Sequence, residues 1–144
     1  CSIASKDVTP IGGIIKETAN FVLHQDPEIP IKNFLIITSK KHVQSIAQLT
    51  SQENLELFDL CYEARKALLP FEDILDCKII QEEHSGHFHM WILPRYEWMS
   101  EMFDKTLSSV RPIMKYAREN RISKNEIDEI VYAVDKLRKM MLFE

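Results

Sequence analysis

The chain has 144 residues, of which 45% are hydrophobic and 28% charged, the profile of one soluble globular domain. Eighteen lysines and arginines against 22 acidic residues give a net charge of -4, so no overall positive field exists to attract duplex DNA or an anionic membrane. The longest apolar runs have strand length, far below the ~20 residues of a membrane-spanning helix. We therefore expect neither a duplex DNA partner nor a transmembrane segment.

Three cysteines, Cys1, Cys61 and Cys77, form an odd set without a Cys-x-x-Cys pair. They can build neither a disulfide framework nor a four-cysteine zinc site. A reducing compartment fits them best, so we expect a cytoplasmic location. A first residue Cys1 is consistent with a trimmed chain, with initiator removal or with a processed lipoprotein.

Three short runs rich in β-branched or apolar residues predict strands in the first part of the chain. They cover residues Ile14 to Thr18, Phe21 to His24 and Phe34 to Thr38. The segment from Asp26 to Pro30 predicts a loop, because each proline fixes φ and lacks a hydrogen-bond donor.

An amphipathic helix follows these strands. Thr50 and Glu53 have the spacing of a capping box, and Pro70 ends the run. Between them, apolar residues recur at helical spacing, namely Leu57, Phe58, Cys61, Ala64 and Leu68.

The strand pattern then returns from Cys77 to Gln81 and from His87 to Leu93. Two more helices are predicted after it. Ser123 and Glu126 form a second capping box, and Pro112 kinks or restarts the helix before it. Each helix carries one apolar stripe, best explained by core packing, with a dimer interface as the alternative. The stripes are Met99, Met102, Phe103, Leu107, Val110, Ile113 and Met114, then Ile127, Ile130, Val131, Val134, Leu137 and Met141.

Basic residues accompany the first of these helices. They indicate a solvated face, with a collar for a polyphosphate as the alternative. They are Lys105, Arg111, Lys115, Arg118 and Arg121.

Three of the five histidines fall within six residues, at His84, His87 and His89. Side chains on a strand alternate between faces, so His87, His89 and Trp91 share one face, and apolar residues share the other. Two imidazoles at this spacing suit either a divalent metal, with His84 or Glu83 as a third ligand, or a nucleophilic histidine oriented by its neighbour. Histidines on an exposed edge strand are the remaining interpretation.

The run His87-Phe88-His89-Met90-Trp91-Ile92-Leu93, followed by Pro94-Arg95, resembles the signature of the histidine triad hydrolases and nucleotidyl transferases. That signature reads His-φ-His-φ-His-φ-φ, where φ is apolar. Upstream, the segment from Phe34 to His42 is similar to the family's strand and basic turn before its long helix. The resemblance spans Ile14 to Arg95, and the helical tail from Tyr96 onward lies outside it.

The resemblance implies an α+β fold, with a five-stranded antiparallel sheet, a long helix packed across it and a nucleotide lying over the histidine face. We expect this domain at residues 1–95. A C-terminal helical extension at 96–144 is expected to pack on the same unit. The resemblance also implies a homodimer.

The same resemblance assigns roles to the histidines. The middle one, His89, is the expected nucleophile on the α-phosphate. A neutral imidazole can attack phosphorus and form a phosphoramidate, from which water releases a nucleoside monophosphate. His87 would orient His89 or bind phosphate.

The third position of the triad holds Trp91 instead of histidine. Its indole donates one N–H but cannot exchange a proton near pH 7. We expect His84 to supply the missing imidazole, and Trp91 either to stack on the base or to fill the pocket. Ser85 belongs to a shortened form of the family's phosphate-contacting stretch before the triad and is a candidate substrate contact.

Two further residues complete the expected site. Asp26 is the candidate for reading the ribose, with His24 and Gln25 as alternatives, and His42 is a candidate near the phosphate.

Some relatives bind structural zinc through an N-terminal Cys-x-x-Cys, of which only Cys1 remains here. Zinc held by Cys1, His42 and His87 is an alternative, but we expect no resident metal and no cofactor.

The sequence therefore predicts a nucleotide-binding hydrolase or transferase. It would cleave a nucleoside monophosphate from a dinucleoside polyphosphate or phosphoramidate through a covalent intermediate on His89. The alternatives are a non-catalytic nucleotide-binding protein with a degenerate triad, and metal-dependent chemistry at His84, His87 and His89.

Overall fold

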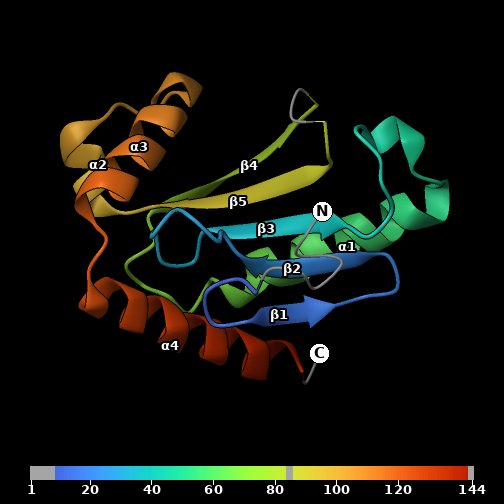
Figure 1. Ribbon diagram of the computed structural model, residues 1–144, viewed down its shortest axis with the longest axis horizontal. Helices are drawn as coiled ribbons and strands as arrows, with labels where there is room; N and C mark the ends of the chain where they lie inside the picture. The colour runs from blue at the N-terminus through green and yellow to red at the C-terminus, as the bar shows by residue number, and fades with distance from the viewer. Residues whose placement is uncertain (1–8, 84–85, 143–144) are drawn as a thin grey trace.

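The computed structural model describes residues 9–83 and 86–142 (Figure 1). Within these residues, five strands form one antiparallel sheet in the order β1-β2-β3-β5-β4. The strands are β1 (Ile14–Glu17), β2 (Phe21–Gln25), β3 (Leu35–Ser39), β4 (Asp76–Glu82) and β5 (His89–Arg95). The helices are α1 (Ser51–Ala67), α2 (Glu97–Met102), α3 (Val110–Asn120) and α4 (Lys124–Met141), with short 3-10 turns η1 (Ile46–Gln48) and η2 (Leu107–Ser109).

The predicted α+β fold is confirmed, as is each of the five predicted strands. The last strand differs in its start, because β5 begins at His89 and not at His87. The predicted alternation nevertheless holds along it, since Phe88, Met90 and Ile92 are buried together on one side of the sheet.

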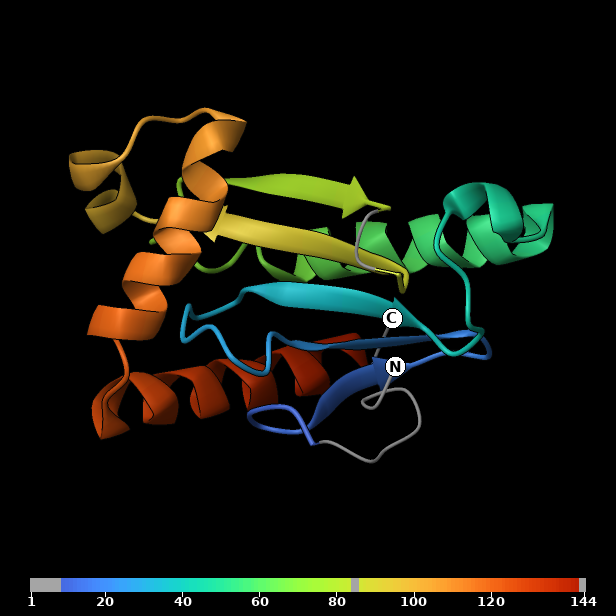
Figure 2. The ribbon, with the colours of Figure 1, turned by 45° about the horizontal axis from the view of Figure 1, so that its top comes forward.

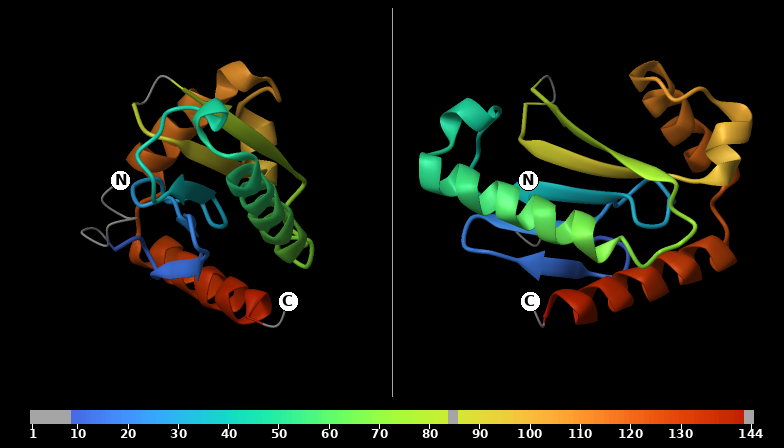
Figure 3. Two further views of the ribbon diagram at one scale, coloured as in Figure 1. Left: turned by 90° about the vertical axis from the view of Figure 1, so that its right-hand side faces the viewer. Right: turned by 180° about the vertical axis from the view of Figure 1, so that it is seen from behind.

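Helices cover the two faces of the sheet unequally. The α1 and α4 helices lie on one side, whereas α3 stands on the opposite side at the end where β5 leaves the sheet (Figures 2 and 3). The first side is the larger core, in which side chains from the sheet pack with Leu57, Leu60 and Ala64 of α1. On the second side α3 covers only one end of the sheet, so the rest of this face can form a binding site.

The α1 helix begins as predicted. The Thr50 hydroxyl accepts from the Glu53 amide, and the Glu53 carboxylate accepts from the Thr50 amide, so the capping box is complete. Phe58 was expected on the buried stripe, but it is 53% exposed. The buried positions of α1 centre on Leu57, Leu60 and Ala64, which turns Phe58 outward.

The last third contains three α-helices in the described part of the chain, where two were predicted. The first apolar stripe is divided between α2 and α3, and its residues Met102 and Leu107 are exposed. Pro112 lies in the first turn of α3 and restarts the helix, because a proline there loses no helical hydrogen bond. In the second stripe Val131 is exposed, whereas Ile130, Val134, Leu137 and Met141 are buried in the core.

The predicted cap of α4 is half formed. The Ser123 hydroxyl accepts from the Glu126 amide, as expected. The Glu126 carboxylate accepts instead from Arg121, at 2.9 Å, and so ties the end of α3 to the start of α4.

The α4 helix docks directly on β1. Val134 packs so closely on Gly12 that a Cβ atom at Gly12 would lie 2.8 Å from the Val134 Cβ. Arg138 donates to the Ile14 carbonyl at 2.9 Å and to the Gly12 carbonyl. Since Leu137 is buried in the same core as the sheet, α4 helps to hold β1 in place. No helix in the described ranges is long and apolar enough to cross a membrane.

Candidate functional site

The open side of the sheet carries two rows of facing residues. Across β2, β3 and β5, one row runs His24, Ile36, Trp91, and the next contains Thr38 opposite His89. Strand pairing therefore places these side chains on one face.

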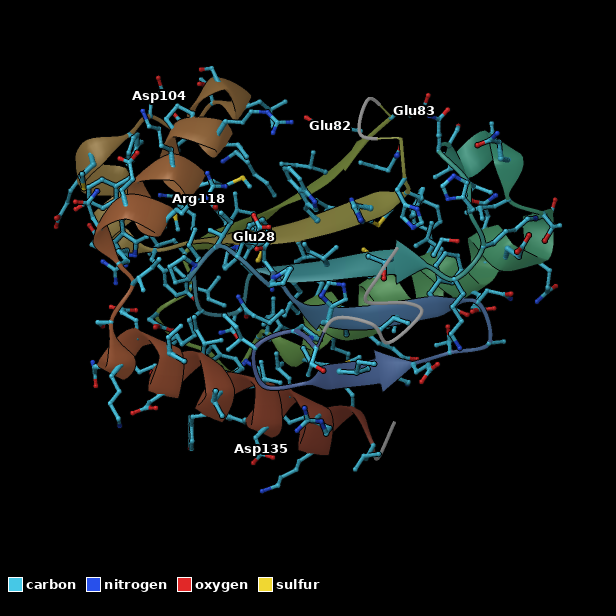
Figure 4. All side chains as sticks on the ribbon, viewed as in Figure 1. Glu28, Glu82, Glu83, Asp104, Arg118 and Asp135 are labelled. Carbon is cyan, nitrogen blue, oxygen red and sulfur yellow. The ribbon has the colours of Figure 1, made fainter. Side chains whose placement is uncertain are left out.

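A pocket of about 210 Å³ lies over these rows. The loop after β2 and the α3 helix form its walls. Figure 4 shows Glu28, from the loop, and Arg118, from α3, beside each other in front of the sheet, and both line the pocket. Its floor and apolar wall are formed by His24, Thr38, His89, Trp91 and Met114.

His89 lies half-buried at the start of β5 and lines this pocket. Burial, with smaller contributions from the nearby His87 and His24, lowers its pKa from 6.5 to about 4. The imidazole is therefore neutral at pH 7 and keeps a lone pair on one ring nitrogen. A neutral ring with a lone pair is the form in which histidine acts as a nucleophile.

His87 lies beside His89, with 5.5 Å between their ring centroids. A hydrogen bond with the Ser39 backbone holds the His87 ring, and burial lowers its pKa. The exposed His42 is 5.3 Å from His87, centroid to centroid. The structure thus brings together the predicted residues His42, His87 and His89 in a row. Of these three, His89 lines the pocket, whereas His87 and the outer His42 lie beside it.

His24 is a functional candidate to which the sequence analysis gave too little weight. It is 1% exposed, and its Nδ1 lies 2.8 Å from the Gln25 carbonyl oxygen. A carbonyl can only accept, so Nδ1 carries the proton and Nε2 carries the lone pair in the neutral ring. Nε2 is buried and has no hydrogen-bond partner among the described residues. Alternation along β2 could have found it, because Leu23 faces the core and His24 must face the other way.

Thr38 adds a second polar atom of the same kind. Its side chain is 1% exposed, and its Oγ1 has no hydrogen-bond partner in the part of the chain that the structure describes. Buried polar atoms are normally paired, so two such atoms lining one pocket point to a ligand that completes them.

Trp91 forms part of the pocket wall and is itself held from two sides. Its ring meets Phe34 edge to face, with centroids 6.0 Å apart, and the Arg111 guanidinium carbon lies 5.6 Å from its ring centroid. Arg111 in turn bonds to Glu82 at 2.6 Å. The indole is half-buried, so it can present an aromatic surface to a ligand without filling the pocket.

Asp26 lines the pocket, but its carboxylate also holds the loop. Its Oδ1 accepts from the amides of Glu28 at 2.8 Å and Ile29 at 2.7 Å. Burial raises the pKa of Asp26, while these two amides lower it. The side chain therefore fixes the turn that forms one wall of the site.

The candidates His84 and Ser85 lie outside the described residues, as does Cys1. The metal alternatives that include His84 or Cys1 are therefore outside them too. Among the residues described, no three histidine, cysteine or acidic side chains are grouped so that they could hold a metal ion.

The five predicted basic residues do not form one collar. Arg118 lines the pocket and Arg111 lies over Trp91, so two of them adjoin the site. Arg121 packs on Trp98 and bonds to Glu126, away from the pocket. The remaining two, Lys105 and Lys115, are exposed.

Comparison with solved structures shows which known fold this is. A zinc-bound histidine triad family protein from Mycobacterium smegmatis is similar over 97% of this chain and 94% of its own, with a TM-score of 0.63 and 16% identity. A hypothetical histidine triad nucleotide-binding protein from Sulfolobus tokodaii is similar over 98% of this chain and 91% of its own, with a TM-score of 0.68 and 14% identity. A histidine triad family protein from Bacillus anthracis is similar over 94% of this chain and 92% of its own, with a TM-score of 0.61 and 16% identity.

At these identities the likeness shows the fold. A scan against protein-family models and a search of curated protein sequences found no match. The structural likeness covers nearly the whole chain and so extends beyond Ile14 to Arg95 into the C-terminal helices.

Proposed function

Because the chain has the histidine triad fold, we propose that it is a nucleotide-binding hydrolase or nucleotidyl transferase. It cleaves a nucleoside monophosphate from a dinucleoside polyphosphate or a phosphoramidate through a covalent intermediate on His89. One observation carries this proposal. The neutral His89 lies in a pocket with the aromatic ring of Trp91 and with two buried polar atoms, His24 Nε2 and Thr38 Oγ1, that have no hydrogen-bond partner among the described residues.

The proposed reaction has two displacements at phosphorus. A ring nitrogen of His89 attacks the α-phosphorus, and the bond from phosphorus to the leaving group breaks with its electron pair on the leaving group. Water then attacks the phosphorus, and the phosphorus–nitrogen bond breaks with its pair returning to the imidazole. The low pKa of His89 supports this role, since no proton has to leave the ring before it attacks.

The other residues of the pocket position the substrate. Trp91 and Met114 provide a wall for a base. Arg118 at the mouth, and Arg111 above Trp91, supply positive charge for phosphate oxygens. His87 orients His89 through their ring contact, and His42 extends the row toward solvent.

We also propose a homodimer and a cytoplasmic location. The outer side of α1 exposes Leu55, Phe58 and Tyr62, and the neighbouring edge strand β4 exposes Ile79. Exposed apolar side chains beside an open sheet edge are typical of a surface that a second copy covers. Cys61 and Cys77 are free thiols, which fits a reducing compartment.

A second function has one observation in its favour. Trp91 occupies the third position of the triad and cannot transfer a proton near pH 7. A site of this kind that binds nucleotide and does not turn it over would be a nucleotide-binding protein built on the same fold.

Release of nucleoside monophosphate distinguishes the two functions. The purified protein and its His89→Ala variant are incubated with diadenosine polyphosphates and adenosine phosphoramidates, with and without chelator. We expect turnover that survives the chelator and is lost in His89→Ala, while that variant still binds adenosine monophosphate. Binding without turnover in the wild type would favour the second function, and loss of turnover on chelation would indicate a metal-dependent reaction.

A further inference from the structure

The pocket contains a second imidazole whose free nitrogen the mechanism has not yet used. His24 sits on β2, diagonally across β3 from His89, and both rings line the same pocket. His24 also contributes to the lowered pKa of His89. Because both rings line one pocket, they can act on the same substrate.

The hydrogen bond of Nδ1 determines what Nε2 of His24 can do. Nδ1 donates to the Gln25 carbonyl at 2.8 Å, which fixes the tautomer and the plane of the ring. Nε2 is left with its lone pair, buried and without a hydrogen-bond partner among the described residues. A buried nitrogen in that state accepts a hydrogen bond or a proton from whatever fills the pocket.

We propose that His24 is a catalytic residue that accepts a proton from the attacking water in the second displacement, the step that frees His89. This rests on the proposed function and adds a base to it. The water oxygen forms a bond to phosphorus, and the phosphorus–nitrogen bond to His89 breaks with its electron pair returning to the imidazole. One proton of the water passes to Nε2 of His24 and then to solvent.

Trp91 leaves a place in the mechanism for such a residue. In the family pattern its position would hold an imidazole, but the indole N–H cannot take up a proton. His24 supplies a proton acceptor from β2, an element that the triad motif does not include. The surrounding pocket contributes Asp26 and Glu28 from the loop and Arg118 from α3, none of which bonds to the His24 ring in the described contacts.

The test separates the two displacements. The probe is the p-nitrophenyl ester of adenosine 5′-monophosphate, whose leaving group departs as a stable anion and needs no proton. Release of nitrophenolate reports the first displacement, and release of adenosine monophosphate reports the second. Both are followed at millisecond to second times in the full chain.

Two variants distinguish proton transfer from pocket shape. His24→Asn keeps an amide that can donate to the Gln25 carbonyl, but it removes Nε2. His24→Gln places an amide near the position of Nε2, where it can bond to a ligand but cannot take up a proton. Thermal unfolding and adenosine monophosphate binding establish that each variant is folded and has a site.

We expect both variants to show a burst of about one nitrophenolate per protein, followed by a steady state about 100-fold slower than that of the wild type. Nucleotide bound covalently to His89 accumulates during the burst. If both displacements slow equally, or if neither slows, His24 is not the proton acceptor. If the wild type releases no nitrophenolate, or if His89→Ala releases it as fast, the proposed function itself is wrong.

Discussion

At the scale of single residues, the site depends on how each ring is held. His89 and His24 are both neutral, and for the same reason, because burial lowers the pKa of each. They differ in their hydrogen bonds, since Nδ1 of His24 is fixed by a carbonyl. Trp91 is held by Phe34 and Arg111, so its ring has a defined position in the pocket.

The low pKa of His89 predicts that kcat/KM falls only at unusually low pH. Burial lowers this pKa from 6.5 to about 4, so the nucleophile stays unprotonated well below neutral pH. We expect kcat/KM to lose little between pH 7 and about 5 and to fall as the pH drops toward 4. A pH profile of kcat/KM checks this. A fall in kcat/KM centred at pH 6.5 would show that burial does not lower the pKa of His89.

The same shift affects stability. The unfolded His89 binds its proton at a higher pH than the folded one, so the stability that it contributes is complete above 6.5 and is lost as the pH falls toward 4. His89→Ala should therefore flatten the pH dependence of the unfolding free energy in this window, which urea titrations at several pH values can measure.

Trp91 is expected to stack on the base. Stacking of a base on an aromatic ring contributes about 1–3 kcal/mol, so Trp91→Ala should raise the Kd for adenosine monophosphate by roughly 5- to 150-fold. Trp91→Phe keeps an aromatic face and is the matched control, with a Kd close to that of the wild type. Isothermal titration measures both. Tighter binding in Trp91→Ala would mean that the indole blocks the pocket.

At the scale of elements, local signals predicted most boundaries. The Thr50 and Glu53 capping box and the proline-rich loop act through neighbouring backbone groups, so their effects can be seen in sequence. Alternation along a strand is also a local signal, and it placed His87, His89 and Trp91 on one face. His24 was underrated because its place beside His89 depends on how β2, β3 and β5 pair, and long-range pairing is not encoded by spacing. Asp26 was a candidate for the ribose because it is acidic, whereas the structure shows that its carboxylate also holds the turn after β2.

The docking of α4 on β1 predicts an asymmetry between two glycines. Gly12 and Gly86 both have positive φ, at 79° and 75°, so alanine at either position costs about 1–2 kcal/mol of backbone strain. A Cβ at Gly12 would also lie 2.8 Å from Val134, whereas a Cβ at Gly86 would lie 4.0 Å from its nearest neighbour among the described residues. Overpacking adds about 1–3 kcal/mol at Gly12. Urea unfolding should therefore show a larger loss for Gly12→Ala, and equal losses would mean that α4 does not press on β1.

At the scale of the whole molecule, the sheet separates two functions. One face packs with α1 and α4 in the main core, and α3 stands on the other side (Figure 3). That other face carries the pocket in which we propose that the substrate binds. On α3, Arg118 lines the pocket and Arg111 lies over Trp91, although the sequence resemblance ended before this helix. The C-terminal helices therefore contribute both to the core and to the site.

The proposed dimer uses the outer side of α1 and the edge of β4. Phe58 is 53% exposed, so Phe58→Lys should leave the fold intact while placing a charge in the apolar contact. We expect light scattering to show a dimer for the wild type and a monomer for this variant. Ile122→Lys, at a position 64% exposed between α3 and α4, is the matched control and should remain dimeric. A wild-type monomer, or dissociation by both variants alike, would contradict this surface.

The measurement that tests the central claim most directly is the mass of the protein during turnover. The wild type and His24→Asn are mixed with the p-nitrophenyl ester of adenosine monophosphate and quenched in alkali, which preserves a phosphorus–nitrogen bond. Proteolytic peptides are then mapped by mass spectrometry. We expect one adenosine monophosphate on the peptide at His89, most abundant in His24→Asn. Turnover without any adduct, or an adduct on a different residue, would contradict a nucleophilic His89.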